Sequence, residues 1–513
     1  MRFTGPITRA TRAGSALGLI ALSVAFAWTS RHWLLVGDAS LMHYVVFLIE
    51  KGWTPYKDIV DVNLPGTYAV EWFAIHTFGP GSAAWRCFDL AVCFGIAAAM
   101  SSIAWKEDRF AGPTAGALFL LVHGRDGMNE LGQRDLVMTL LLLCSTALLV
   151  RFRDRGHLPS LVIAGALAGF AATIKPTASV FWIAMLGYVC WKAESRREAV
   201  KTGAAGLSSF LLAPVAAVFY LWHRGALDSF WSTATELMPL HNRLLRVPDT
   251  YFLLHPFASS LLVVCLLWLI VTAMRYRSRT VRWTDTEVLL LIGLLCGLFS
   301  FYIQRKALPY HRYPANGYLV LLACLGFCKS LKTLSASMSL RAVGAIGLLF
   351  CTLLVGPQCF LKSLRLSSTP DDFSGLLQND LAGLGGPALD RKIQCIDFTA
   401  GCITTLYRMR LQQSTGFLYD CYLFQPGADP AIDRYRSAFW QRLVASAPQV
   451  IVLSNHDCGH PNNFAKIRGW PRFASLLGEQ YSLVKEVHPP HQLQWASKAE
   501  PPYFYRIYER NSR

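Results

Sequence analysis

Ionisable side chains gather in a few short segments of this 513-residue chain, between long apolar runs. The segments that place carboxylates beside cations contain Asp38, His43, Asp58, Asp61, Arg125, Asp126, Glu130, Arg134, Asp135, Lys175, Arg305, Lys306, His311 and Arg312. A carboxylate can take a proton from an attacking hydroxyl group, and lysine and arginine bind phosphate oxygens. This combination predicts a site that holds an anionic headgroup and deprotonates a second group.

The acidic residues also have structural alternatives. Asp38 precedes a helical pattern and could serve as its N-cap, which is compatible with a chemical role. Asp58 and Asp61 lie in a turn-rich stretch, where aspartate commonly bonds to nearby backbone. Asp135 opens an apolar helix, where an acid complements the helix dipole. Residue type and position alone leave these alternatives open.

Two of the segments contain cations that predict phosphate binding. Lys175 stands between two apolar runs, where anion binding competes with a lysine that snorkels to the membrane surface. The later run carries the donors Arg305, Lys306, Tyr310, His311 and Arg312, with Tyr313 just after it. Such donors suit a phosphate group, and general contact with anionic lipid is the alternative.

Membrane-spanning helices must position these residues. Hydrophobic residues make up 53% of the chain and charged residues 16%, whereas ordinary soluble domains contain about 25% charged residues. Long apolar runs recur at Ala16–Ala27, Leu136–Val150, Leu207–Trp222, Leu261–Ala273, Val288–Ile303 and Ala342–Val355. A bilayer-crossing helix needs about 20 such residues, so we predict an all-α polytopic membrane protein of about eleven transmembrane helices.

The distribution of cations predicts the orientation in the membrane. The formal net charge is +17. Basic groups precede the first span and follow every second span, at Arg2, Arg9, Arg12, Lys106, Arg109, Arg151, Arg153, Arg155, Lys192, Arg196, Arg197, Lys201, Arg275, Arg277, Arg279, Arg282, Lys329, Lys332 and Arg341. Because cytoplasmic loops collect cations, we expect a cytoplasmic N-terminus, an extracytoplasmic C-terminus and location in the cytoplasmic (inner) membrane. This pattern argues against nucleic-acid binding. A signal peptide ending at Ala25-Phe26-Ala27 is the alternative for the first segment.

We expect two domains. Residues 1–359 form the transmembrane domain, whose first external loop, residues 37–82, contains helical patterns at Ala39–Lys51 and Thr67–Phe78 that suit helices lying at the interface. Residues 360–513 form a small extracytoplasmic α/β domain, because short apolar runs alternate there with helical patterns. Its four cysteines, Cys395, Cys402, Cys421 and Cys458, are compatible with one or two disulfides of open pairing.

Four motifs in this order carry a resemblance to a known family. They are Gly37-Asp38 followed by Gly52…Pro55-Tyr56-x-Asp58 and Pro65; Gly132-Gln133-Arg134-Asp135; Ile174-Lys175-Pro176; and Lys306…Tyr310-His311-Arg312-Tyr313-Pro314. Over residues 10–330 the chain resembles the GT-C integral-membrane glycosyltransferases, which include the protein O-mannosyltransferases, the lipid A aminoarabinose transferases and the lipopolysaccharide galacturonosyltransferases. These enzymes use polyprenyl-phosphate sugars as donors.

The resemblance implies roles for individual residues. Asp38 would be the general base, and Asp135 the second acidic residue, which orients the acceptor or contacts a metal. The lipid phosphate would be held by Lys175, Lys306 and Tyr310 or Tyr313. Beyond the resemblance, we expect Asp58, Arg134, His311 and Arg312 also to bind the substrate or the lipid phosphate. Many relatives have Asp-Glu in the first motif, whereas Ala39 follows Asp38 here. Metal ligands therefore stay unassigned, and a divalent cation, Mg²⁺ or Mn²⁺, stays an open alternative.

The predicted function is that of an inverting membrane glycosyltransferase. It would move a sugar from a polyprenyl-phosphate donor to a lipid, glycan or protein acceptor of the cell envelope, on the outer face of the cytoplasmic membrane. The first alternative is a transporter or flippase of a lipid-linked or anionic substrate, although such proteins usually carry charges near mid-membrane and internal repeats. A ligase or polymerase acting on lipid-linked glycans and a non-catalytic scaffold are the remaining alternatives.

Overall fold

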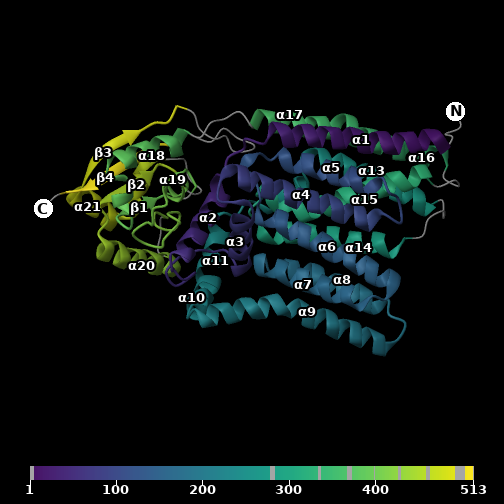
Figure 1. The fold of residues 1–513 in the computed structure, drawn as a ribbon, viewed down its shortest axis with the longest axis horizontal. Helices are drawn as coiled ribbons and strands as arrows, with labels where there is room; N and C mark the ends of the chain where they lie inside the picture. The colour runs from purple at the N-terminus through teal and green to yellow at the C-terminus, as the bar shows by residue number, and fades with distance from the viewer. Residues whose placement is uncertain are drawn as a thin grey trace.

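The computed structural model describes residues 5–277, 283–332, 337–366, 372–397, 399–425, 429–457, 463–490 and 503–511. A bundle of long helices runs along the molecule, and a smaller domain with a sheet covers one end of it (Figure 1). This arrangement confirms the predicted fold class, a polytopic helical membrane protein with a small C-terminal α/β domain.

The bundle contains the predicted apolar segments. Its helices are α1 (Gly5–Thr29), α4 (Ser82–Ala104), α5 (Ala111–Gly124), α6 (Arg134–Arg155), α7 (Leu158–Ile174), α8 (Ala178–Trp191), α9 (Arg196–His223), α13 (Ser259–Arg277), α14 (Asp285–Gln304), α15 (Tyr313–Lys332), α16 (Met338–Phe350), the π-helical turn η4 (Cys351–Val355) and α17 (Gly356–Leu366). Within the described residues, eight helical runs are long and apolar enough to cross a membrane, and α5, α7 and α8 are shorter apolar helices. The last run, Met338–Leu366, continues past the domain boundary predicted at residues 359 and 360.

Small residues allow close packing between helices of the bundle. A Cβ atom added to Gly169 on α7 would lie 1.9 Å from the carbonyl oxygen of Phe210 on α9. One added to Gly165 would lie 2.1 Å from Ser209 Oγ. Helices pack in lipid through such small residues, because apolar side chains gain little by leaving a hydrocarbon solvent. The glycines of α7 therefore position Lys175, which follows this helix.

The basic segments gather at the end of the bundle away from the sheet domain. Ion pairs join them to acids there, among them Arg12–Asp108, Lys106–Asp154, Arg153–Asp285, Arg275–Glu287 and Lys329–Glu107. Arg2, Arg279 and Arg282 lie outside the described residues. The assignment of this end to the cytoplasm stays a prediction from charge.

The loop of residues 37–82, which the charge distribution predicts to be external, contains the two predicted helices, α2 (Gly37–Glu50) and α3 (Pro65–Phe78). Their surroundings differ from the expected interfacial position. Residues along α2 from Gly37 to Leu48 are buried, apart from Asp38, which is partly exposed. On α3, Trp72 and Phe73 are exposed, as an interfacial helix requires. Packing against the C-terminal domain thus covers the face of α2 that would be exposed if the helix lay at the membrane interface.

Short helices complete the end of the bundle that faces the sheet domain. They are η1 (Met128–Glu130), α10 (Leu227–Ser232), η2 (Thr233–Leu237), α11 (Met238–Leu244), α12 (Asp249–Leu254) and η3 (Pro309–Arg312). Gly66, in the first turn of α3, meets the end of α7 so closely that an added Cβ would lie 2.2 Å from Thr173 Oγ1. This approach sets the first loop beside the turn that carries Lys175.

The C-terminal domain is built on a four-stranded sheet of order β1-β2-β4-β3, with β1 and β2 parallel and the other pairs antiparallel. Its elements are α18 (Asp372–Gly383), η5 (Gly386–Leu389), β1 (Ile393–Ile396), α19 (Cys402–Met409), α20 (Pro430–Ser446), β2 (Val450–Ser454), η6 (Phe464–Gly469), α21 (Pro471–Gln480), β3 (Tyr481–Val487) and β4 (Tyr505–Arg510). Cys395 and Cys402 form a disulfide between β1 and α19. Cys421 is also disulfide-bonded, and Cys458 lies outside the described residues.

Hydrogen bonds join this domain to the loop of residues 37–82. On α2, Ser40 Oγ lies 2.6 Å from Thr404 Oγ1, and the Tyr44 hydroxyl accepts from the backbone N–H of Gln413 at 2.7 Å. Trp53 Nε1 donates to Gln412 Oε1 at 2.9 Å. The C-terminal domain therefore packs directly on the helix that begins with Asp38.

Candidate active site

Asp38 lies in the first turn of α2 and is held by two other segments of the bundle. Its Oδ2 accepts from Arg134 Nη2 at 3.0 Å and from the Tyr310 hydroxyl at 3.4 Å. The helix begins after Val36, without a side-chain cap, so the alternative role of Asp38 as an N-cap is wrong. The Asp38 side chain keeps 23% of its surface exposed, which leaves it accessible to a substrate.

Arg134 and Asp135, at the start of α6, point to different partners. Arg134 bridges Asp38 and Asn63, whose Oδ1 accepts from Arg134 Nη1 at 2.6 Å. Asp135 is fully buried, and its Oδ2 accepts from Lys175 Nζ at 2.5 Å. Asp135 Oδ1 is buried without a hydrogen-bond partner. This carboxylate therefore lies beneath Lys175, and its role as a residue that orients the acceptor or contacts a metal stays a prediction.

Lys175 connects α7 with the other cationic segment. Its Nζ donates to Gln304 Oε1 at 2.6 Å and lies 5.4 Å from the centre of the Tyr310 ring. Burial, opposed by the nearby carboxylate of Asp135, lowers the pKa of Lys175. The ammonium group at the end of α7 thus joins the start of α6 to the run from Gln304 to Tyr310, so that three segments distant in sequence share one charged contact.

Lys306 is the cation of this cluster for which the described structure shows neither a hydrogen bond nor an ion pair. Burial, together with repulsion from Lys175 and Arg134, lowers its pKa to about 7, against weaker attraction from Asp38 and Asp135. An anion bound beside Lys306, such as a phosphate, would favour the charged form of this side chain.

His311 and Glu130 lie buried in the neighbourhood of the cluster. The His311 ring stands edge-on to Tyr310 at 4.6 Å between ring centres, and its Nδ1 is buried without a partner. Glu130 Oε2 is likewise buried and unpaired. Burial and the neighbouring Asp126 and Asp38 raise the pKa of Glu130 well above its usual range.

Three predicted ligands form their hydrogen bonds with partners outside the cluster. Asp58 Oδ2 accepts from the backbone N–H of Thr54 at 2.8 Å and closes the turn, its structural alternative. Arg312 Nη1 donates to the carbonyl oxygen of Phe257 at 3.3 Å. The Tyr313 hydroxyl lies 2.9 Å from His123 Nδ1, deep in the bundle. Successive residues of a helical turn point in different directions, so the side chains of one short run cannot all face one substrate.

The structure therefore brings together four segments of the chain, which carry Asp38, Arg134, Asp135, Lys175, Lys306, Tyr310 and His311. It adds Asn63 and Gln304, which sequence reasoning did not select. Asn63 stands two residues after Asp61 in the turn-rich loop. Gln304 is the last residue of α14, and Arg305 and Lys306 follow it. An uncharged amide at such a position is common in turns and helix ends, so its sequence signal was weak.

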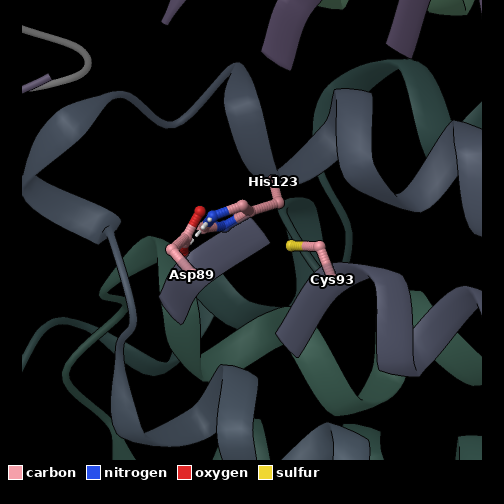
Figure 2. A group of neighbouring side chains, drawn as sticks. All are labelled: Asp89, Cys93 and His123. Atoms are coloured by element: carbon pink, nitrogen blue, oxygen red, sulfur yellow. Dashed lines mark hydrogen bonds and ion pairs between the residues drawn. The ribbon is translucent and has the colours of Figure 1, made fainter. Parts of the chain in front are cut away.

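A separate buried cluster, Asp89, Cys93 and His123, has ligand atoms within 4.8 Å of one another, as a metal site requires (Figure 2). Hydrogen bonds already occupy two of these residues. His123 Nε2 lies 2.9 Å from Asp89 Oδ1 and His123 Nδ1 bonds to Tyr313. Asp89 Oδ1 also accepts from the backbone N–H of Gly132 at 2.7 Å, and Asp89 Oδ2 pairs with Arg86. A thiol and an imidazole also suit Mg²⁺ or Mn²⁺ poorly.

This network instead anchors the loop that leads into α6. Gly132 adopts a positive φ of 58°, and an added Cβ would lie 2.3 Å from the ring of Trp85. A bond from Asp89 to the N–H of Gly132 therefore fixes the position from which Arg134 and Asp135 extend. The ligand atoms of Asp89, Cys93 and His123 are close enough to hold a metal, but Asp89 and His123 already form hydrogen bonds that stabilise the fold.

Comparison with known proteins identifies related folds. Residues 106–222 match the family model described as dolichyl-phosphate-mannose-protein mannosyltransferase. The structure of ArnT from Cupriavidus metallidurans bound to undecaprenyl phosphate is similar over 96% of this chain and 98% of that chain, with 14% identity and a TM-score of 0.59. No match was found among curated protein sequences.

An archaeal enzyme has a related structure. The oligosaccharyltransferase of Archaeoglobus fulgidus in the apo form is similar over 88% of this chain and 70% of that chain, with 12% identity and a TM-score of 0.52. AglB from the same organism, in complex with an inhibitory peptide and a dolichol-phosphate, matches with 11% identity and a TM-score of 0.52 over 87% of this chain and 69% of that chain.

Proposed function

We propose that this protein transfers a sugar from a polyprenyl-phosphate donor to an envelope acceptor. Its fold is that of the GT-C membrane glycosyltransferases, as its sequence motifs predicted. The observation that carries the proposal is the position of Asp38 beside Arg134, Tyr310, Lys175 and Lys306. A base and several cations in one place match the two needs of this reaction. The related structures hold undecaprenyl phosphate and dolichol-phosphate, which supports a lipid phosphate as the donor carrier.

Asp38 is the proposed general base. Arg134 and Tyr310 both contact its Oδ2, so Oδ1 is the oxygen left to accept a proton from the acceptor hydroxyl. The acceptor oxygen then bonds to the anomeric carbon as the bond from that carbon to the phosphate oxygen breaks. The electron pair of the broken bond stays on the polyprenyl phosphate. Direct displacement of this kind inverts the anomeric centre.

The cations stabilise the charge that develops on the departing phosphate. Within the described structure Lys306 forms neither a hydrogen bond nor an ion pair, so its ammonium group is available to the phosphate. Lys175 is held in place by Asp135 and Gln304. Preorganised charges of this kind need no rearrangement when the transition state forms, and they often supply the largest part of catalysis. We assign phosphate binding to Lys306 and Lys175, and we assign to Asp135 the orientation of Lys175.

The location follows from the same chemistry. Nucleotide sugars are absent outside the cytoplasmic membrane, so a transferase there depends on a lipid-linked donor. Asp38 lies in the first turn of α2, and α2 lies at the end of the bundle that carries the C-terminal domain (Figure 1). If the basic end faces the cytoplasm, as the distribution of cations predicts, the site opens on the outer face.

The test starts from a strain of the source organism that lacks the gene. Mass spectrometry of its envelope lipids, glycans and proteins should show the loss of one sugar, and the wild-type gene should restore it. Asp38→Asn should express normally and restore none. Asp58→Asn is the matched control, because Asp58 is a carboxylate of the same loop that closes a turn, and it should restore the sugar.

Two results would contradict the proposal. An unchanged envelope profile in the deletion strain would favour transport or a scaffold role, and full activity of Asp38→Asn would refute the base. Transfer by purified protein in detergent micelles, where no second leaflet exists, separates a transferase from a flippase. A flippase would show no product there, even with the lipid-linked donor supplied.

A further inference from the structure

Asp61 is a fully buried carboxylate that the proposed reaction does not use. Its Oδ1 accepts from the Val62 N–H at 2.7 Å, from Asn63 Nδ2 at 2.8 Å and from the Tyr419 hydroxyl, and its Oδ2 accepts from the Tyr68 hydroxyl at 2.7 Å. Burying a carboxylate is costly unless donors replace the lost water. Four donors converge here from the first loop, α3 and the C-terminal domain.

These bonds determine how the amide of Asn63 is oriented. Asn63 Nδ2 donates to Asp61 and lies 3.3 Å from the Tyr419 hydroxyl. An amide has its donor and its acceptor on opposite sides. Oδ1 must therefore face away from Asp61, and it accepts from Arg134 Nη1 at 2.6 Å. A flipped amide would place its oxygen against the Asp61 carboxylate and its N–H groups against Arg134, and both contacts would be repulsive.

The orientation of Asn63 in turn affects Arg134. A guanidinium group is planar and presents its donors in a rigid fork. Arg134 uses Nη1 on Asn63 and Nη2 on Asp38 Oδ2. Because both bonds lie in the plane of the guanidinium group, loss of the bond to Asn63 would let the group rotate and would weaken the bond to Asp38.

The C-terminal domain supplies Tyr419 to this network through a close backbone approach. The Val60 N–H donates to the carbonyl oxygen of Gly416 at 2.8 Å. A Cβ atom added to Gly416 would lie 1.7 Å from the carbonyl oxygen of Asp58. Only glycine fits there, and the contact sets Tyr419, three residues later, against Asp61.

We propose that Tyr419 and Asp61 are positioning residues that hold Asn63, and through it Arg134, against the base Asp38. The C-terminal domain then contributes Tyr419 as a residue that positions the groups of the transferase site. This inference rests on the proposed function. It assigns no contact between Tyr419 or Asp61 and a substrate.

The test uses Tyr419→Phe, which removes one hydroxyl and keeps the ring. The assay is the initial rate at which the induced protein restores the missing sugar in the deletion strain, at matched protein level. We expect the rate to fall about tenfold, as when an oriented contact near a reacting group is lost. Tyr505→Phe is the matched control, because the Tyr505 hydroxyl donates to Asp380 Oδ2 at 2.8 Å elsewhere in the same domain. It should stay within about twofold of the wild type.

A double-mutant cycle distinguishes positioning from a general loss of stability. Residues that act through one contact do not add their effects. Asn63→Ala should slow transfer, and Tyr419→Phe added to it should slow transfer no further. A wild-type rate for Tyr419→Phe, or full multiplication of the two effects, would overturn the inference. Absence of transfer in the wild type would overturn the proposed function first, and this inference with it.

Should Tyr419→Phe accumulate poorly, Asn63→Ala alone keeps the inference open to refutation. Asn63 is only partly buried, and its removal leaves the Tyr419–Asp61 bond in place. Normal transfer by this variant at normal protein level would show that Arg134 needs no support from Asn63.

Discussion

Lys175 Nζ lies between Asp135 Oδ2, at 2.5 Å, and Gln304 Oε1, at 2.6 Å, and it faces the Tyr310 ring. Asp135 is completely buried, and Lys175 retains 19% of its side-chain surface. The carboxylate thus favours the charged form of Lys175 and leaves one side of the ammonium group open. This relationship is the basis for assigning Lys175 to the lipid phosphate and Asp135 to its support.

The buried pair predicts that neither member can be removed alone without a loss of stability. Asp135→Asn leaves a buried ammonium without its anion, and loss of one partner of a buried pair costs about 3–5 kcal/mol. The thermal midpoint of the purified protein in detergent should therefore fall. Asp135→Asn combined with Lys175→Met should recover much of the midpoint, because no charge is then left unpaired, while transfer stays absent. A double variant as unstable as the single one would contradict the ion-pair assignment.

The lowered pKa of Lys306, about 7, predicts how donor-carrier binding depends on pH. Above pH 7 this lysine is mostly neutral, and an anion that needs its ammonium form must bind together with a proton. Affinity for undecaprenyl phosphate should be steady below pH 7 and should weaken above it, by at most about tenfold for each pH unit. Fluorescence or calorimetric titration from pH 6 to 9 measures this change.

Lys306→Arg is the control for this titration. Arginine keeps its charge throughout this range, so its binding curve should lose the weakening that sets in above pH 7. The phosphate of the probe titrates equally in both proteins, and the difference between their curves isolates the lysine. Identical curves for the two proteins would show that Lys306 does not contact the phosphate.

The approach of Gly416 to the Asp58 carbonyl predicts a strong effect of one methyl group. Gly416→Ala must push the two backbones apart, since the added Cβ would lie 1.7 Å from the oxygen. We expect the domains to separate more readily and limited proteolysis of the C-terminal domain to accelerate. Gly478→Ala, at a position with open space around the added Cβ, should behave like the wild type. Equal proteolysis of both variants would place the domain contact elsewhere.

The cluster of Asp89, Cys93 and His123 predicts insensitivity to chelators. Its imidazole and carboxylate are already bonded to Tyr313, Gly132 and Arg86, so folding has no need of a metal there. EDTA should leave the thermal midpoint unchanged, whereas Asp89→Asn should lower it by leaving buried Arg86 unpaired. A midpoint that drops in EDTA and returns with zinc would reverse this interpretation.

Local sequence signals predicted the membrane-spanning segments and the separation of the basic segments from the site residues. The motifs predicted that Asp38, Arg134 and Lys175 lie near one another. Hydropathy and helical period are properties of neighbouring residues, so the chain displays them without its fold. The motif order then pointed to the GT-C fold, which the structure confirms over nearly the full length of ArnT.

Tertiary structure decided which residues of each motif face the site. Tyr310 reaches Asp38 while Tyr313 turns into the bundle to His123, and Asp58 closes a turn while Asp61 is buried beside Tyr419. The direction of a side chain depends on helix rotation and on contacts with segments hundreds of residues away. No local pattern contains that information, and for the same reason the sequence carried no signal for Tyr419.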